Sequence, residues 1–258
     1  MLLTPFVCAA ILLRQVSWQE LAVLLAILCA FAVKDPLVTI ARQMFVWKQP
    51  HAETRAAWRY AGIEAALMVV LGAAIALSRD WRPFAALACG AAAFTAIAVA
   101  VNVRNKQRSV WFQIASAAAL TSTSIAACLA VLNRVPAWGW LLWLLCALQA
   151  FAGIFVVHAR LDARIALRKA DAGKDRSRRV AIASQLAMAF AAAGFAAAGY
   201  PFVASALLVA AGAYFFDMRR QKDAGSLQMP LTSVGKQALT VSTVFAIMIV
   251  VGLWRVNV

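Results

Sequence analysis

Charged and polar side chains gather where the long apolar stretches of this sequence end. The candidates for chemistry at these ends are Lys34, Asn102, Arg104, His158, Arg160, Asp162 and Arg164. Lysine and arginine bind phosphate, diphosphate and carboxylate groups, and arginine does so through two parallel hydrogen bonds. Arg160, Arg164 and Arg168 follow at i, i+4 and i+8, which places them on one helix face. The residues at the ends of these apolar stretches predict a site that binds an anionic head group. The alternative interpretation is that they form a basic surface that only contacts lipid head groups.

Two further polar residues, Glu64 and Gln113, lie inside or at the edge of apolar stretches. An ionised carboxylate in hydrocarbon is costly, so Glu64 indicates either a proton carrier or ligand contact, or an interior ion pair or hydrogen bond. Gln113, Ser116 and Ser124 fall near one helical stripe, which indicates either the lining of a cavity or hydrogen bonds between helices.

The amino-acid composition indicates whether the protein is surrounded by water or by lipid. Of 258 residues, 64% are hydrophobic and 14% charged, whereas an ordinary globular chain is roughly 45–50% apolar and about 25% charged. This excludes a soluble enzyme, a disordered chain and a disulfide-rich secreted scaffold. The lipid bilayer is therefore the expected surrounding, and the chain is expected to be a single integral membrane domain, residues 1–258.

A hydrocarbon core about 30 Å thick needs about 20 helical residues. The apolar stretches lie at 1–13, 19–33, 58–78, 83–103, 109–132, 136–157, 180–200, 202–217 and 237–256. They predict an all-α fold, a multi-pass transmembrane bundle of about nine helices. The first stretch is short, so either that helix is short or, as we favour, the chain begins inside it. Pro201 predicts a tight turn, and the small residues at 191–199 predict a segment packed inside the bundle.

The basic residues predict the orientation. Of the 25 lysines and arginines, 20 lie in or beside the even-numbered connections. These connections are expected to be cytoplasmic, with the N-terminus inside and the C-terminus outside. The same topology explains the net charge of +15, so no nucleic-acid partner is expected. Eight of the nine tryptophans lie near segment ends, as in an interfacial belt, and only Trp143 lies a turn or two inside.

The sequence contains few residues and no motif of the kinds that bind a cofactor or a metal ion. The chain has two histidines, His51 and His158, and no Walker loop, G-x-S-x-G or H-E-x-x-H motif. The five cysteines lie in apolar segments without a C-x-x-C pair, which is typical of buried hydrophobic residues. We therefore expect neither a cofactor nor a metal site.

Four short segments carry a resemblance to a known family: Met1–Phe6, Arg108–Gln113, His158–Arg164 and Pro230–Gln237. Through them the chain resembles the YwiC-like family of bacterial integral membrane proteins, and its helix count and long 2–3 and 6–7 connections are similar to the UbiA-type prenyltransferase architecture. The resemblance implies a place in the bacterial cytoplasmic membrane. Family members usually carry a His-Gly-Ala-Trp-like segment before the position of Met1, and glutamates where Gln113 and Gln237 stand here.

UbiA-type enzymes hold magnesium against a diphosphate with two aspartate-rich motifs. The 2–3 connection offers only Asp35 and the distant Glu53, while the 6–7 connection offers Asp162 and the pair Asp171 and Asp175. Because the first motif is absent, magnesium-dependent prenyl transfer is disfavoured, and whether the protein is an enzyme at all stays open.

Three functions remain. The first is a UbiA-like bundle that binds an amphipathic isoprenoid or phospholipid, its anionic head at the cytoplasmic mouth. The second is a transporter of a small anion, suggested by Glu64, the polar fifth stretch and a break at Lys34-Asp35-Pro36. The third is a membrane assembly protein without a ligand. The sequence does not predict the oligomeric state.

Overall fold

A computed structural model describes residues 2–49, 51–106, 109–169 and 175–254, and within these ranges the chain forms helices and short connections, with no strand. The helices are α1 (Leu3–Leu13), α2 (Trp18–Ala32), α3 (Lys34–Arg42), the π-helical η1 (Gln43–Trp47), α4 (Glu53–Ser78), α5 (Trp81–Val103), α6 (Val110–Thr121), α7 (Thr123–Leu132), α8 (Ala137–Lys169), α9 (Asp175–Ala197), α10 (Pro201–Arg220), α11 (Ala224–Leu227) and α12 (Leu231–Trp254).

The predicted all-α, multi-pass bundle is confirmed. Among the described residues, eight helical rods are long and apolar enough to cross a membrane, and each overlaps most of one predicted stretch. The remaining stretch forms α1, which at 11 residues spans only about 17 Å. No discontinuous span forms at Lys34, because Val33, the one residue between α2 and α3, keeps helical angles of φ −60° and ψ −21°, and α2, α3 and η1 continue as one rod.

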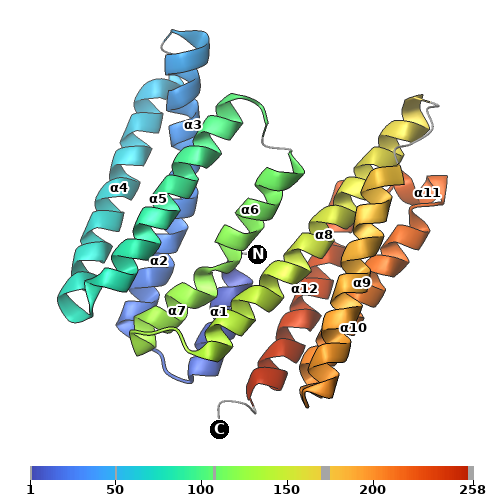
Figure 1. Ribbon diagram of the computed structural model, residues 1–258. Helices are drawn as coiled ribbons and strands as arrows, with labels where there is room; N and C mark the ends of the chain where they lie inside the picture. The colour runs from blue at the N-terminus through green and yellow to red at the C-terminus, as the bar shows by residue number, and fades with distance from the viewer. Residues whose placement is uncertain (1, 50, 107–108, 170–174, 255–258) are drawn as a thin grey trace.

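The helices form two lobes with a narrower region between them (Figure 1). The first lobe contains α2 to α5, and the second contains α8 to α12. Helices α1, α6 and α7 lie between the lobes: α7 packs on α1, α2 and α8, α6 packs on α8, and α1 packs on α12. Every residue of Thr123–Val131 in α7 is buried, so the core of the molecule is centred on this short helix.

Local signals in the sequence set several of the helix ends. The Ser17 hydroxyl accepts a hydrogen bond from the Glu20 N–H at 3.2 Å, and Asp80 accepts one from the Arg82 N–H at 3.2 Å. Such caps satisfy N–H groups that have no partner within the helix. At the predicted tight turn, Gly199 adopts φ +83°, a conformation that glycine permits, and Pro201 begins α10.

The fifth stretch, predicted as one helix, is interrupted at Ser122. The Ser122 N–H bonds the Ala119 carbonyl instead of the Ala118 carbonyl four residues back. The Ala118 carbonyl is instead satisfied by Trp143 Nε1 at 3.0 Å and by the Thr121 hydroxyl at 3.1 Å. Hydroxyl groups that bond the preceding turn bend helices. The interruption also explains why Trp143 lies inside its span.

The prediction that residues 191–199 pack inside the bundle is wrong. Ala192 is buried, but Ala193, Gly194 and most of the small residues that follow are exposed. Helix α9 packs mainly on α8 and α10, at the edge of the second lobe. Only one side of α9 therefore meets protein.

Candidate functional site

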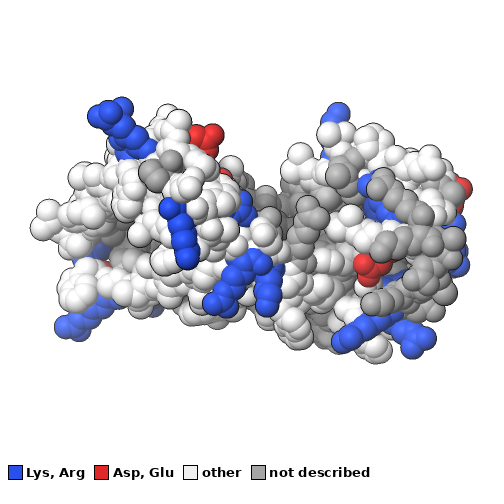
Figure 2. All heavy atoms as spheres, turned by 90° about the horizontal axis from the view of Figure 1, so that it is seen from above, with Lys and Arg blue, Asp and Glu red and all other residues white. Residues whose placement is uncertain are grey.

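Most of the basic side chains lie at one end of the bundle, which we call the basic end. It carries the ends of η1, α5, α8 and α10 and the starts of α4, α6, α9 and α12, while α1 meets α2, α4 meets α5, α7 meets α8 and α9 meets α10 at the opposite end (Figure 1). Viewed from above, both lobes present lysine and arginine side chains at this end (Figure 2). Among the described residues only two ion pairs form, Lys34 with Asp35 and Arg160 with Asp217. Most of the described lysines and arginines at this end therefore form no ion pair with a described acidic residue.

In the first lobe, the candidate residues Lys34, Asn102 and Arg104 have different surroundings. Lys34 Nζ lies 3.7 Å from Asp35 and 5.8 Å above the Phe31 ring. Asn102 is buried and donates to the Ala98 carbonyl of its own helix at 2.9 Å. Arg104 is exposed. Lys34 and Arg104 are thus the members of this group that remain accessible to a ligand.

Arg42, which was not among the candidates, links the helices that carry these residues. Its Nη2 donates to the Asn102 carbonyl at 3.1 Å and to Asn105 Oδ1 at 3.3 Å. Asn105 has φ 55°, a left-handed conformation that asparagine tolerates better than most residues. Arg42 thereby holds α3 against the end of α5, beside Arg104.

In the second lobe, Arg160 forms a buried ion pair. Its Nη2 lies 2.8 Å from Asp217 Oδ1, and the side chains are only 4% and 10% exposed. Gln221 donates to the other carboxylate oxygen, Asp217 Oδ2, at 3.0 Å. Nε and Nη1 of Arg160 are buried without a hydrogen-bond partner among the described residues. Arg160 therefore joins α8 to α10, with two nitrogen atoms left to donate to a water molecule or a ligand.

The neighbouring candidates also join helices. Arg164 donates from Nε to the Leu227 carbonyl and from Nη2 to the Met229 carbonyl, so it caps the end of α11. Asp162 accepts a hydrogen bond from the Ser177 hydroxyl on α9. The side chain of Arg168 lies outside the described part of the structure. The basic stripe predicted on this helix is thus largely engaged with protein.

His158 and Gln113 meet in the region between the lobes. His158 Nε2 on α8 lies 2.9 Å from Gln113 Oε1 on α6, and both side chains are partly buried. With the amide oxygen as acceptor, the ring nitrogen is the donor. This contact connects two residues that the sequence singled out separately.

Glu64 forms no ion pair or hydrogen bond with any described residue, and its Oε2 atom is buried. It lies on α4 between Ala61 and Met68, which belong to the apolar cluster formed with Val33 and Ile40. The interior ion pair or hydrogen bond that was one of its interpretations is therefore not present among the described residues.

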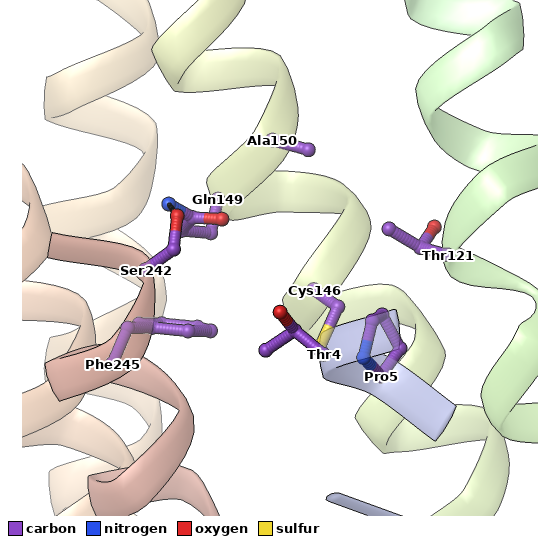
Figure 3. A pocket seen from close by; sticks show the side chains of 8 residues that line it. All are labelled: Thr4, Pro5, Thr121, Cys146, Gln149, Ala150, Ser242 and Phe245. Atoms are coloured by element: carbon purple, nitrogen blue, oxygen red, sulfur yellow. Dashed lines mark hydrogen bonds between the residues drawn. The ribbon is translucent and has the colours of Figure 1, made fainter. Parts of the chain in front are cut away.

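A small pocket lies near the middle of the spans, between α1, α6, α8 and α12 (Figure 3). Its lining comprises Thr4, Pro5, Thr121, Cys146, Gln149, Ala150, Ser242 and Phe245, none of which is charged. The space that the centre of a water molecule can occupy is about 20 Å³, enough for about one water molecule.

Gln149 organises one wall of this pocket. Its Nε2 lies 2.6 Å from the Tyr214 hydroxyl oxygen and 3.0 Å from Ser242 Oγ, so α8, α10 and α12 meet at one amide. A Cβ atom on Gly153 would lie 3.0 Å from the Tyr214 hydroxyl oxygen, which explains why glycine stands there. The Gln149 amide oxygen points into the pocket (Figure 3).

Asp217, Gln221 and Tyr214, whose side chains bond to α8 or to one another, were not among the candidate residues. Asp217 offered one signal, an acidic residue at the end of an apolar stretch, but nothing in its local sequence indicates its partner. The described residues contain no group of three His, Cys, Asp or Glu side chains that could hold a metal ion, and Asp171 lies outside them.

The comparisons with known proteins identify a family but no ligand. Neither the curated proteins nor the solved structures give a match, so the UbiA-like arrangement stays a prediction. Residues 1–128, about half of the chain, match the family model described as YwiC-like protein. The match includes α1 to α5, α6 and most of α7, and thus Lys34, Arg104 and Gln113. The chain is a multi-pass membrane protein of the YwiC-like family.

Proposed function

We propose that this protein binds an amphipathic lipid, an isoprenoid or a phospholipid, with its anionic head at the basic end and its tail between helices. The observation that supports this most is the uncompensated positive charge at that end, where the described lysines and arginines form only two ion pairs. A phosphate or diphosphate would supply the missing negative charge.

In this proposal the candidate residues divide into two groups. Lys34, Arg104 and His158 contact the head group, because the side chains of Lys34 and Arg104 are accessible and the His158 ring has a second nitrogen atom. Asn102, Arg160, Asp162 and Arg164 position the helices that carry those contacts. We further propose that the basic end is cytoplasmic and that the protein lies in the bacterial cytoplasmic membrane.

The test is the lipid that copurifies with the protein in mild detergent, quantified by mass spectrometry. We expect an anionic lipid bound to the wild type and about thirtyfold less in the Lys34→Gln/Arg104→Gln variant, because each of the two cations contributes about 1 kcal/mol to the binding of anionic lipid. The Arg82→Gln/Arg134→Gln variant, altered at the opposite end, should retain the lipid. Equal lipid in both variants would contradict the proposal.

A small-anion transporter is the second candidate. The interruption of α6 and α7 at Ser122, beside the pocket, favours it, since transporters often bind substrates at discontinuous helices near the membrane midplane. Glu64, with its unpaired buried oxygen, would be the coupling residue.

Uptake of labelled inorganic phosphate into proteoliposomes separates this candidate from the first. The transporter hypothesis predicts uptake above that of protein-free vesicles. It further predicts that Glu64→Gln loses most of this uptake, whereas Glu53→Gln, at an exposed glutamate, leaves it unchanged. Uptake that is insensitive to Glu64→Gln would remove the main support for transport.

A further inference from the structure

The rod formed by α2, α3 and η1 is longer than a membrane requires. It contains 30 residues, Trp18–Trp47, which at 1.5 Å per residue is about 45 Å. The hydrocarbon core is about 30 Å thick. With Trp18 at one interface, the last residues of the rod therefore extend beyond the core at the other side. We call residues 43–49 and 51–55 the α3–α4 tip.

The α3–α4 tip presents a continuous run of apolar side chains that the described part of the protein leaves largely exposed. Met44, Phe45, Val46 and Trp47 are 61%, 72%, 52% and 47% exposed. Successive helical residues point in different directions, so four consecutive exposed residues leave most of this turn uncovered, and Gln43 marks the side that faces α4. Exposed apolar patches of this kind mark interaction surfaces.

The neighbouring helix indicates the depth of this run. Ala57 and Ile40 belong to the same apolar cluster, so the exposed Trp58 lies close to the level of Ile40. Tryptophans of this kind favour the membrane interface. Met44 to Trp47 lie four to seven residues beyond Ile40, which is about 6–10 Å farther out. This is the layer of the lipid head groups.

The charges around the run favour one occupant. Lys48 follows it directly, and Arg55 and Arg59 lie on the facing helix; all three are exposed. Glu53 is the only acidic residue between positions 36 and 63. Basic side chains next to exposed aromatic and aliphatic ones are typical of surfaces that bind anionic lipid.

The conformation of the tip is fixed by its own contacts. The Thr54 hydroxyl donates to Gln43 Oε1 and accepts from the His51 N–H at 3.0 Å. The Trp47 and His51 rings lie 5.2 Å apart. Hence η1 and the start of α4 form one unit that carries both the apolar run and the cations.

We propose that the α3–α4 tip is a docking surface for the acidic phospholipid head groups of the surrounding leaflet. The apolar run lies at the boundary between head groups and acyl chains, and Lys48 and Arg55 contact the phosphates. Because the rod enters the bilayer immediately below, lipid is the partner in continuous contact with it. This surface is separate from the ligand of the proposed function.

Hydrogen–deuterium exchange of the full chain in lipid nanodiscs tests this proposal. Peptides that contain Gln43–Trp47 are expected to exchange about tenfold more slowly when phosphatidylglycerol is added to phosphatidylcholine. The Lys48→Gln/Arg55→Gln variant should lose this difference, and the Arg82→Gln/Arg134→Gln variant should keep it. Raising the salt concentration should reduce it in the wild type.

Two results would overturn the proposal. One is exchange at the tip that does not depend on phosphatidylglycerol in the wild type. The other is protection that appears only when a second protein is added, which would assign the surface to a protein partner. Retention of lipid at the basic end is measured separately, so either proposal can fail without the other.

Discussion

Replacement of Asp217 by alanine is expected to lower the free energy of unfolding by about 3–5 kcal/mol. The reason is that its partner Arg160 is buried: the Arg160 side chain is 4% exposed and loses the one acidic contact that the described residues give it. A buried guanidinium without a counter-charge is far more costly than an exposed one. Reversible unfolding in mixed micelles, followed by circular dichroism, measures the change.

The exposed pair Lys34 and Asp35 provides the matched control. Its atoms are 3.7 Å apart and the Asp35 side chain is 84% exposed, so Asp35→Ala should change the free energy of unfolding by less than about 1 kcal/mol. The double variant Arg160→Met/Asp217→Leu should recover most of the stability lost in Asp217→Ala. Similar losses for Asp217→Ala and Asp35→Ala would contradict the buried ion pair.

Replacement of Gly252 by alanine is expected to destabilise the contact between α12 and α10 by about 1–3 kcal/mol. A Cβ atom there would lie 3.0 Å from Val203 Cγ2, 3.1 Å from Phe202 Cβ and 3.2 Å from the Val203 backbone nitrogen. The backbone atom cannot rotate away as a side chain can, so the two helices must separate. The same unfolding measurement reports the change.

Gly212 on α10 is the control for this substitution. No atom lies within 4 Å of a Cβ built there. Gly212→Ala should therefore leave stability unchanged or raise it by up to about 1 kcal/mol, since alanine favours the helix over glycine. Destabilisation of equal size at both positions would show that close helix packing at Gly252 is not the cause.

The sequence predicted the spans because membrane thickness imposes a length on every apolar stretch. Each rod must supply about 20 apolar residues, so a charge break such as Arg104 marks an end without any knowledge of packing, whereas at Lys34 the rod continues to Trp47. Pro201 predicted its turn for a similar local reason, since proline restricts its own backbone.

Contacts between distant residues could not be predicted in this way. Arg160 was expected to face an anionic ligand, but its partner Asp217 lies 57 residues away and depends on how α8 meets α10. Arg164 bonds carbonyls of a connection whose shape the sequence does not specify. Residues 191–199 were wrongly predicted for the same reason. Small residues permit close packing of helices, but they do not determine whether another helix lies beside them.

The most direct test of the proposed head-group site is which side of the membrane each connection faces. The site requires all the basic connections to face one compartment. Reporter fusions placed after Lys106 and after Lys222 should both report the cytoplasm, and fusions after Asp80 and after Arg134 should report the opposite side. Reporters at Lys106 and Lys222 that lie in different compartments would contradict the account.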